Sequence, residues 1–528
     1  MQDGMFHKRS APRLCSREKL LFLSEKQLTT DKGFCYNKHV GRQDSCPFFV
    51  AIWFLREYNS KRFGAGEVRA VKNDFSQGKM WRNILAQAIP LTVAQAVQVL
   101  YNIVDRIYLG HLPGENSLAL TGVGLIFPIV ALVTAFCNLF ASGGAPLCAM
   151  ARGAGKEDRA EKILNSSFTM LLTTAIVLTA VGYGFRKPIL YVFGASDDTY
   201  PFADAYLTIY LAGTVFSMLA TGMNGFVNAQ GFPRVGMLTI VLGAALNVIL
   251  DPIFIFALDM GVRGAALATV ISQMVSCGWV LRFLFGKRAI LRLKPRLMGI
   301  DFELLKEIVA LGLPGFIMAG TNCLVQVTCN ATLRQYGGDL YIGIMTVINS
   351  VRELFSLPVT GLTQGAQPVI SFNYGAKEYR RVRSGIAFIS VVGAVFTTVC
   401  WAAVLASPRF LLSLFSGDAE LVDTGISAMQ IYFFGFFFMS MQFAGQSTFV
   451  ALGKSRQAVF FSLLRKAVIV FPLTLVLPMI GGLGANGVFL AEPISNLLGG
   501  AACFVTMMLT VWRQLKRAEK MAPRGSEE

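Results

Sequence analysis

Long apolar blocks alternate with short polar stretches along most of the chain. After residue 78, twelve blocks of more than twenty mostly apolar residues follow one another. Each block is long enough to cross about 30 Å of hydrocarbon as a helix. The pattern therefore predicts an all-α polytopic membrane protein with spans near 84–109, 118–147, 163–185, 203–229, 235–258, 262–286, 306–333, 340–372, 384–407, 425–452, 457–480 and 485–512.

Residues 1–78 have a different character. They are polar and irregular, and their longest apolar run, 47–55, is too short to span a membrane. No small-residue cleavage site follows a signal-peptide core. We expect this segment to be disordered, or a non-native extension from an upstream start codon, with the native start near Val71 or Met80.

The loops between the blocks carry the orientation signal. Lys and Arg number 22 in one set of alternate loops and five in the other. Cytoplasmic loops are the ones enriched in Lys and Arg. This predicts both termini in the cytoplasm and an even number of spans. It also accounts for the net charge of +17 without nucleic acid as a partner.

Composition agrees with a membrane protein and supplies little catalytic chemistry. The chain is 54% hydrophobic and 15% charged, whereas soluble domains carry about 25% charge. Its ten cysteines form no CxxC pair, and its three histidines have no metal-site spacing. There is no phosphate-binding loop, so we expect no cofactor and no enzyme activity, and any transport must draw on an ion gradient.

The chain also repeats itself at an offset near 222 residues. Gly231 in "NAQGFPR" corresponds to Gly453 in "VALGKSR", Gly264 to Gly487, and Pro90 to Pro314. Six spans per repeat make the repeats parallel, related by an axis along the membrane normal. We therefore predict an N-lobe (79–286), a cytoplasmic linker (287–305), a C-lobe (306–512) and a cytoplasmic tail (513–528).

Polar residues inside the N-lobe spans are the main candidates for function. A carboxylate within a span costs roughly 2.5–3.5 kcal/mol on insertion scales. Asp105 is such a residue, with Tyr101 one turn earlier, and Asn247 and Asp251 are again four residues apart. Both acids fall in the outer half of the membrane, and Thr269 returns to the same level. If the two acids are close, the pocket should bind a proton or a cation such as Na⁺; alternatively, Asp105 pairs with its neighbour Arg106.

Other polar residues are weaker candidates. Pro252 frees a backbone carbonyl one turn earlier, near Val248, and Pro252 and Pro90 are the expected bend points. The C-lobe offers Arg352 and Glu353 in the eighth span and Glu492 in the twelfth. Glu353 could equally pair with a nearby arginine.

Three stretches, "LYNIVDRIYLGHL", "NAQGFPR" and "LNVILDPIFIFALDMGVRGAALATVISQ", resemble the multidrug and toxic compound extrusion (MATE) family over about residues 74–515. The resemblance implies two six-helix lobes that open alternately to the two faces. It also implies cation-coupling roles for the N-lobe pocket, in which all five family positions match: Tyr101, Asp105, Asn247, Asp251 and Thr269.

A second branch of that family also has acids in the seventh and tenth spans. Here Glu307 lies only at the edge of the seventh span and the tenth has no acid, which argues against a coupling site in the C-lobe. The resemblance implies a monomeric efflux transporter of the bacterial cytoplasmic membrane that exchanges H⁺ or Na⁺ for amphipathic, cationic small molecules. The alternative is a flippase for a lipid-linked saccharide of the same superfamily, whose cleft would need basic residues such as Arg106, Arg352, Arg465 and Lys466.

Overall fold

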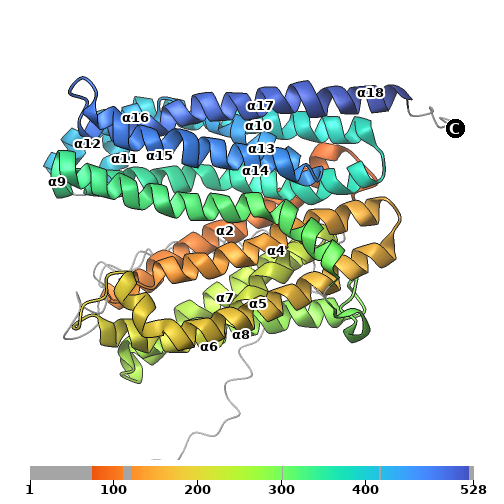
Figure 1. Ribbon diagram of the computed structural model, residues 1–528, viewed down its shortest axis with the longest axis horizontal. Coiled ribbons are helices and arrows are strands. Elements are labelled where there is room, and N and C mark those ends of the chain that lie inside the picture. The colour runs from red at the N-terminus through yellow and green to blue at the C-terminus, as the bar shows by residue number, and fades with distance from the viewer. Residues whose placement is uncertain (1–73, 111–121, 300, 416–417, 522–528) are drawn as a thin grey trace, which may run out of the picture. The chain divides into compact units, whose positions relative to one another are not determined.

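The computed structural model describes residues 74–110, 122–299, 301–415 and 418–521, and these residues form helices and turns without a strand among them (Figure 1). The predicted extension 1–78 lies outside the described residues except for 74–78. The N-lobe helices are α2 (Met80–Gly110), α4 (Phe127–Gly153), α5 (Glu157–Val192), α6 (Tyr200–Ala229), α7 (Pro233–Pro252), the π-helical η1 (Ile253–Ala257) and α8 (Gly261–Phe285).

The C-lobe has more interruptions in its helices. Its elements are α9 (Phe302–Gly375), α10 (Tyr379–Ala406), α11 (Pro408–Ser413), α12 (Ala419–Phe433), η3 (Phe436–Phe438), α13 (Met439–Ala451), α14 (Ser455–Leu463), η4 (Leu464–Val470), α15 (Phe471–Val476), η5 (Leu477–Met479), α16 (Ala485–Ser495), η6 (Asn496–Gly500), α17 (Ala501–Met507), η7 (Met508–Trp512) and α18 (Arg513–Met521). The helix of the twelfth span thus continues to Met521, into the predicted cytoplasmic tail.

Eleven segments in the described part are long and apolar enough to cross a membrane, and one of them, α9, has 74 residues. Gly338 interrupts α9 with φ 69° and ψ −165°. Asn349 Nδ2 lies 3.5 Å from Gln326 Oε1, so the chain reverses at this glycine and its two halves pack side by side. Because α9 contributes two spans, the predicted twelve-helix fold is confirmed.

The internal repeat is visible in the backbone. The turn after α4 has Gly155 at φ 73°, and the turn 222 residues later has Lys377 at φ 62°. A Cβ on Gly264 would lie 2.6 Å from the carbonyl oxygen of Phe254, and one on Gly487 would lie 2.6 Å from the backbone nitrogen of Pro478. Both lobes therefore use the same close helix–turn contact, which only glycine permits.

The two lobes meet backbone to backbone. A Cβ on Gly143 would lie 2.0 Å from the Ile308 oxygen, and one on Gly312 would lie 1.7 Å from the Leu139 oxygen. Gly153 and Gly375 make two further contacts of this kind, related by the 222-residue shift: Gly153 against the Phe372 oxygen at 1.9 Å and Gly375 against the Met150 oxygen at 2.0 Å. These contacts lie in the second half of α4 and toward the two ends of α9, which the charge count places on the cytoplasmic side.

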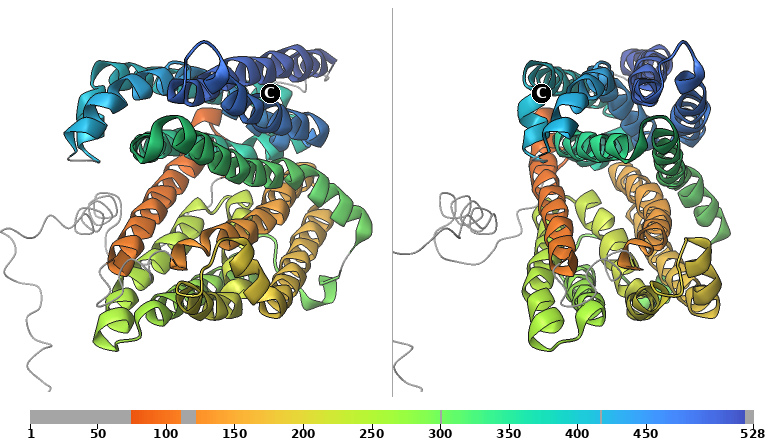
Figure 2. Two further views of the ribbon diagram at one scale, coloured as in Figure 1. Left: turned by 60° about the vertical axis from the view of Figure 1, so that its left-hand side comes forward. Right: turned by 90° about the vertical axis from the view of Figure 1, so that its left-hand side faces the viewer.

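Helix α2 is shared between the lobes, which the predicted boundary at residue 79 did not anticipate. Its first turns, including Met80 and Ile84, belong to a hydrophobic core with C-lobe residues of α9, α10 and α13. The segment before it is fixed by Arg381, which donates to the backbone oxygens of Phe75 and Gly78 at 2.9 and 2.8 Å. Figure 2 shows α2, in red-orange, running from the C-lobe helices toward the N-lobe helices. Residues 74–78 are thus part of the packed structure.

The linker between the lobes is docked on the N-lobe. Asn165 of α5 accepts a hydrogen bond from the Lys294 backbone N–H at 2.8 Å and donates to the Arg292 oxygen at 3.1 Å. Gln230 accepts from the Leu291 N–H at 2.9 Å. These two buried side-chain amides thus form hydrogen bonds with backbone groups of the linker, which has no helical hydrogen bonds of its own at these positions.

Candidate functional site

The predicted N-lobe pocket is assembled from three helices. Asn247 and Asp251 lie one turn apart on α7 and are fully buried, at 1% and 0% exposure, and Thr269 of α8 is 7% exposed. The Asn247 Nδ2 atom donates to Asp251 Oδ1 at 3.2 Å and to Thr269 Oγ1 at 3.3 Å. One amide group therefore connects the acid of the fifth span to the hydroxyl of the sixth.

Helix α2 brings the remaining two predicted residues to this pocket. The hydroxyl of Tyr101 approaches that of Thr269, and Tyr101 lies within electrostatic range of both Asp105 and Asp251. Asp105 is half-buried on the same face of α2, and its carboxylate interacts electrostatically with that of Asp251. The structure therefore brings all five sequence-predicted residues together.

Helix α6 adds two aromatic residues that the sequence analysis missed. Tyr206 and Tyr210 are 7% and 6% exposed, and the Tyr206 hydroxyl also approaches Thr269. Their spacing of four residues places them on one face of α6. The same spacing marks the pairs on α2 and α7, so it was the signal that could have found them.

Two buried oxygens of this pocket have unused hydrogen-bonding capacity. Asp251 Oδ2 and Asn247 Oδ1 are inaccessible and have no hydrogen-bond partner among the described residues. Buried polar atoms are normally paired, and a buried carboxylate without a counter-charge is costly. A proton on Asp251, or a cation that both oxygens coordinate, would satisfy them.

The backbone changes character at the pocket. Pro252 lies inside α7 directly after Asp251, and the next five residues form the π-helical η1. A proline removes a backbone donor and loosens the helix one turn earlier, and π-helical turns are frequent at functional sites. Pro90 lies inside α2 as predicted, within a helix that continues on both sides of it.

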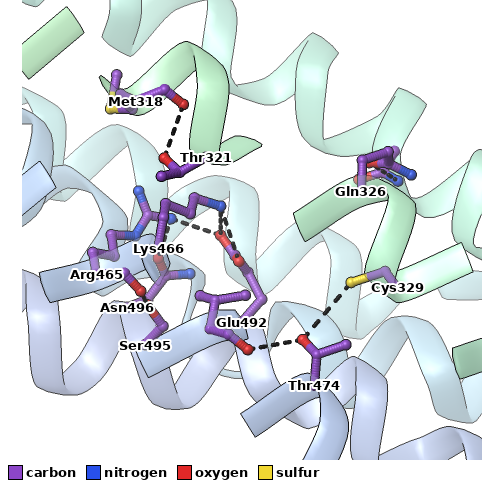
Figure 3. Close-up of polar contacts among 12 residues, drawn as sticks. Met318, Thr321, Gln326, Cys329, Arg465, Lys466, Thr474, Glu492, Ser495 and Asn496 are labelled. Carbon is purple, nitrogen blue, oxygen red and sulfur yellow. Dashed lines mark hydrogen bonds and ion pairs between the residues drawn. The ribbon is translucent and has the colours of Figure 1, made fainter. Parts of the chain in front are cut away.

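The C-lobe holds a second polar cluster, formed around Glu492 (Figure 3). Arg465 Nη2 lies 2.6 Å from Glu492 Oε1, and Lys466 Nζ lies 3.2 Å from Glu492 Oε2. Arg465 also donates to Asn496 Oδ1 at 2.8 Å. All four side chains are buried, on η4, α16 and η6.

The other two C-lobe candidates, Arg352 and Glu353, lie in different surroundings. Arg352 lines a cavity next to Glu492, whereas Glu353 is exposed. Glu353 lies in no salt bridge with an N–O distance below 4.0 Å among the described residues, but its charge interacts with that of the neighbouring Arg352. Glu307, at the start of the seventh span, pairs with Arg159 of the N-lobe at 2.8 Å.

Comparison with known proteins identifies the family. The model of the MatE family matches the chain twice, over residues 90–253 and 314–476, which together make up more than half of it. The chain belongs to the MatE family. The double match also reproduces the internal repeat, one copy in each lobe. The resemblance to MATE transporters and the two-lobe, twelve-helix fold are therefore confirmed.

Curated relatives of this MatE chain are bacterial. It is 25% identical over 440 residues to the multidrug export protein MepA of Staphylococcus aureus (strain NCTC 8325 / PS 47), covering 83% of this chain and 95% of that protein. It is also 25% identical over 409 residues to MepA of Staphylococcus haemolyticus (strain JCSC1435), covering 78% and 89%. The match thus extends over nearly the whole length of both relatives.

Solved structures share the MatE fold. One, described as the outward-facing conformation of a multidrug resistance MATE family transporter, superposes with a TM-score of 0.79 at 23% identity, covering 85% of this chain and 99% of that chain. A transporter of the same superfamily from Pyrococcus furiosus superposes with a TM-score of 0.78 at 23% identity, covering 85% and 98%. At this identity the likeness concerns the fold alone.

Proposed function

We propose that this protein exports amphipathic, cationic small molecules from bacteria in exchange for H⁺ or Na⁺, with both termini in the cytoplasm. The observation that carries the proposal is the buried N-lobe pocket, where one oxygen of Asp251 has no hydrogen-bond partner in the described part of the chain. A carboxylate inside a membrane segment is retained where it binds an ion or a proton. The relatives named for multidrug export support the class of cargo.

The lobe contacts suggest how exchange would proceed. With the glycine contacts of α4 and α9 closed, the cytoplasmic side is shut in the predicted orientation. Binding of H⁺ or Na⁺ at Asp105 and Asp251 would neutralise the pocket and favour a rearrangement at Pro252 and Pro90. Drug would leave to the outside, and the lobes would then separate at the glycine contacts, release the ion and load drug from the cytoplasm.

The flippase alternative requires basic residues that face the cleft and hold a diphosphate. Two of its four candidates, Arg465 and Lys466, are buried and engaged by Glu492. Glu492 offsets one of their two positive charges, so together they present less charge than a diphosphate requires, which favours the export proposal over the flippase.

The test is efflux of a fluorescent cationic dye from proteoliposomes under separately imposed pH and Na⁺ gradients. We expect gradient-driven efflux with the wild type and its loss with Asp105→Asn or Asp251→Asn, because an amide cannot bind the proton and binds cations weakly. The matched control is Asp259→Asn: Asp259 is exposed in the turn before α8 and has φ 52°, a conformation that asparagine tolerates.

Each outcome has a clear meaning. The gradient that drives efflux identifies the coupling ion. Equal efflux by the wild type and both pocket variants would refute a coupling role for the two aspartates. If the wild type moves no cationic dye under either gradient, the cargo proposal is wrong.

A further inference from the structure

The C-lobe contains a cavity of about 140 Å³ that the proposed export cycle does not use. Its wall carries Asn322, Gln326 and Cys329 from the first half of α9, Arg352 from the second half, and Lys466 and Glu492 from η4 and α16. Asn322 and Gln326 are exposed, whereas Lys466 and Glu492 are only 6% exposed. The cavity therefore extends from a neutral amide rim to a charged floor.

The charges of this cavity do not balance. Glu492 is engaged by two cations, Arg465 and Lys466. The Nε atom of Arg352 is inaccessible and has no hydrogen-bond partner among the described residues, and its charge interacts with those of Glu492 and the exposed Glu353. Arg465, Lys466 and the partly buried Arg352 thus outnumber Glu492, the one buried carboxylate that the described residues place among them. Uncompensated buried charge is strongly unfavourable, so the arrangement calls for a further anion.

The position of the cavity corresponds to that of the N-lobe pocket. The two family matches are shifted by 224 residues at their starts, 90 and 314, and by 223 at their ends, 253 and 476. Those shifts place Cys329 where the N-lobe has Asp105 and Thr474 where it has Asp251. Cys329 Sγ and Thr474 Oγ1 lie 3.8 Å apart, and both line the cavity (Figure 3).

The same place in each repeat therefore has opposite charge. In the N-lobe two carboxylates face the pocket, while in the C-lobe neutral side chains replace them and the cations Lys466 and Arg352 are added. The eleventh span is π-helical at Leu464–Val470, and both Arg465 and Lys466 lie in this segment. Such π-helical turns recur at functional sites.

We propose that the C-lobe cavity binds a small oxyanion group, the carboxylate or phosphate of an amphipathic ligand. The planar guanidinium of Arg352 matches the two oxygens of such a group, and Lys466 supplies a second positive charge. The amides of Asn322 and Gln326 at the rim can donate further hydrogen bonds. A volume of about 140 Å³ is sufficient for a carboxylate or phosphate group.

The test measures equilibrium binding to the purified full chain by calorimetry at constant ionic strength. Benzoate and phenyl phosphate present the two candidate groups on the same ring, and benzylammonium presents the opposite charge. We expect at least one of the two anions to bind, and the anion that binds more tightly shows whether the cavity prefers a carboxylate or a phosphate. Arg352→Gln should weaken that binding at least tenfold. The control Arg409→Gln, at an exposed C-lobe arginine that pairs with Asp423, should leave it unchanged.

A second variant tests the sign of the charge effect. Glu492→Gln removes the one acid that lines the cavity among the described residues, and it should tighten anion binding threefold or more, whereas the same change would weaken a proton or cation site. Arg352→Gln leaves the Arg465–Glu492 and Lys466–Glu492 ion pairs intact, so it gives a result even if Glu492→Gln does not fold. Arg352→Lys keeps the charge without the planar fork and should bind with intermediate affinity.

Two results would overturn the proposal. One is the absence of binding by both anions, or binding that Arg352→Gln leaves unchanged. The other is binding of benzylammonium that Glu492→Gln abolishes. Because no gradient and no dye are involved, failure here is distinguishable from failure of the export proposal.

Discussion

The contact between Gly312 and Leu139 should control the closed state of the cytoplasmic side. In Gly312→Ala the new Cβ would lie 1.7 Å from the Leu139 carbonyl oxygen, whereas carbon and oxygen normally approach no closer than about 3.3 Å. The two backbones must therefore separate by roughly 1.6 Å. Overpacking of this kind costs about 1–3 kcal/mol, which corresponds to a shift of about 5–150-fold in the equilibrium between closed and open lobes.

Gly320→Ala is the matched control for this substitution. Gly320 lies two turns further along the same half of α9, and a Cβ there meets no atom within 4 Å. We expect it to leave the conformational equilibrium unchanged, since alanine fits an open helical site.

The assay is a distance distribution between spin labels, in a cysteine-free background, at Lys156 and Glu378 in the turns that follow α4 and α9. Both positions are exposed, and the neighbouring Gly153 and Gly375 mark the lobe contact. Gly312→Ala should shift the population toward longer distances and slow dye efflux, while Gly320→Ala should not. Identical distributions for the two variants would refute the idea that this contact sets the closed state.

Three further substitutions test the packing. Asn373→Leu removes a fully buried amide that accepts from Arg381 and donates to the Phe75 oxygen, and it should lower the free energy of unfolding by about 1–3 kcal/mol in a denaturation series. No change would mean that these hydrogen bonds to residues 74–78 do not stabilise the fold. Asn165→Ala removes the hydrogen bonds that hold the linker backbone at Arg292 and Lys294 against α5. Trypsin should then cleave within 287–299 several-fold faster than in the wild type. Glu492→Ala leaves two buried cations unpaired and should lower the free energy of unfolding by about 3–5 kcal/mol. Asp423→Asn, which breaks an exposed ion pair, should lower it by at most about 1 kcal/mol. Equal thermal stability of the two variants would contradict a stabilising role of the Glu492 cluster.

The fold was largely predictable because the bilayer imposes a simple rule. Each span must satisfy its own backbone hydrogen bonds, so apolar length alone marks a helix. The boundary of the N-lobe was less predictable. Met80 and Ile84 are apolar residues like those of any other span, and nothing in their spacing shows that they pack against the C-lobe.

The N-lobe pocket was predictable for a different reason. Tyr101 and Asp105 on one helix, and Asn247 and Asp251 on another, each lie one turn apart, so local geometry places each pair on one face. That the two faces meet at Thr269 depends on helix packing, which the sequence indicated only indirectly, through their shared depth in the membrane and the family resemblance.

The sequence by itself therefore determined the helical elements, their repeat and the polar pairs within single helices, because these follow from local periodicity and from the cost of polar groups in hydrocarbon. Only the tertiary structure decided which helices pack against one another. It placed α2 between the two lobes, brought the backbones together at Gly312, and placed Arg352 beside Lys466 and Glu492. Residues more than a hundred positions apart come together through packing of complementary surfaces, and no periodicity within one segment encodes that match.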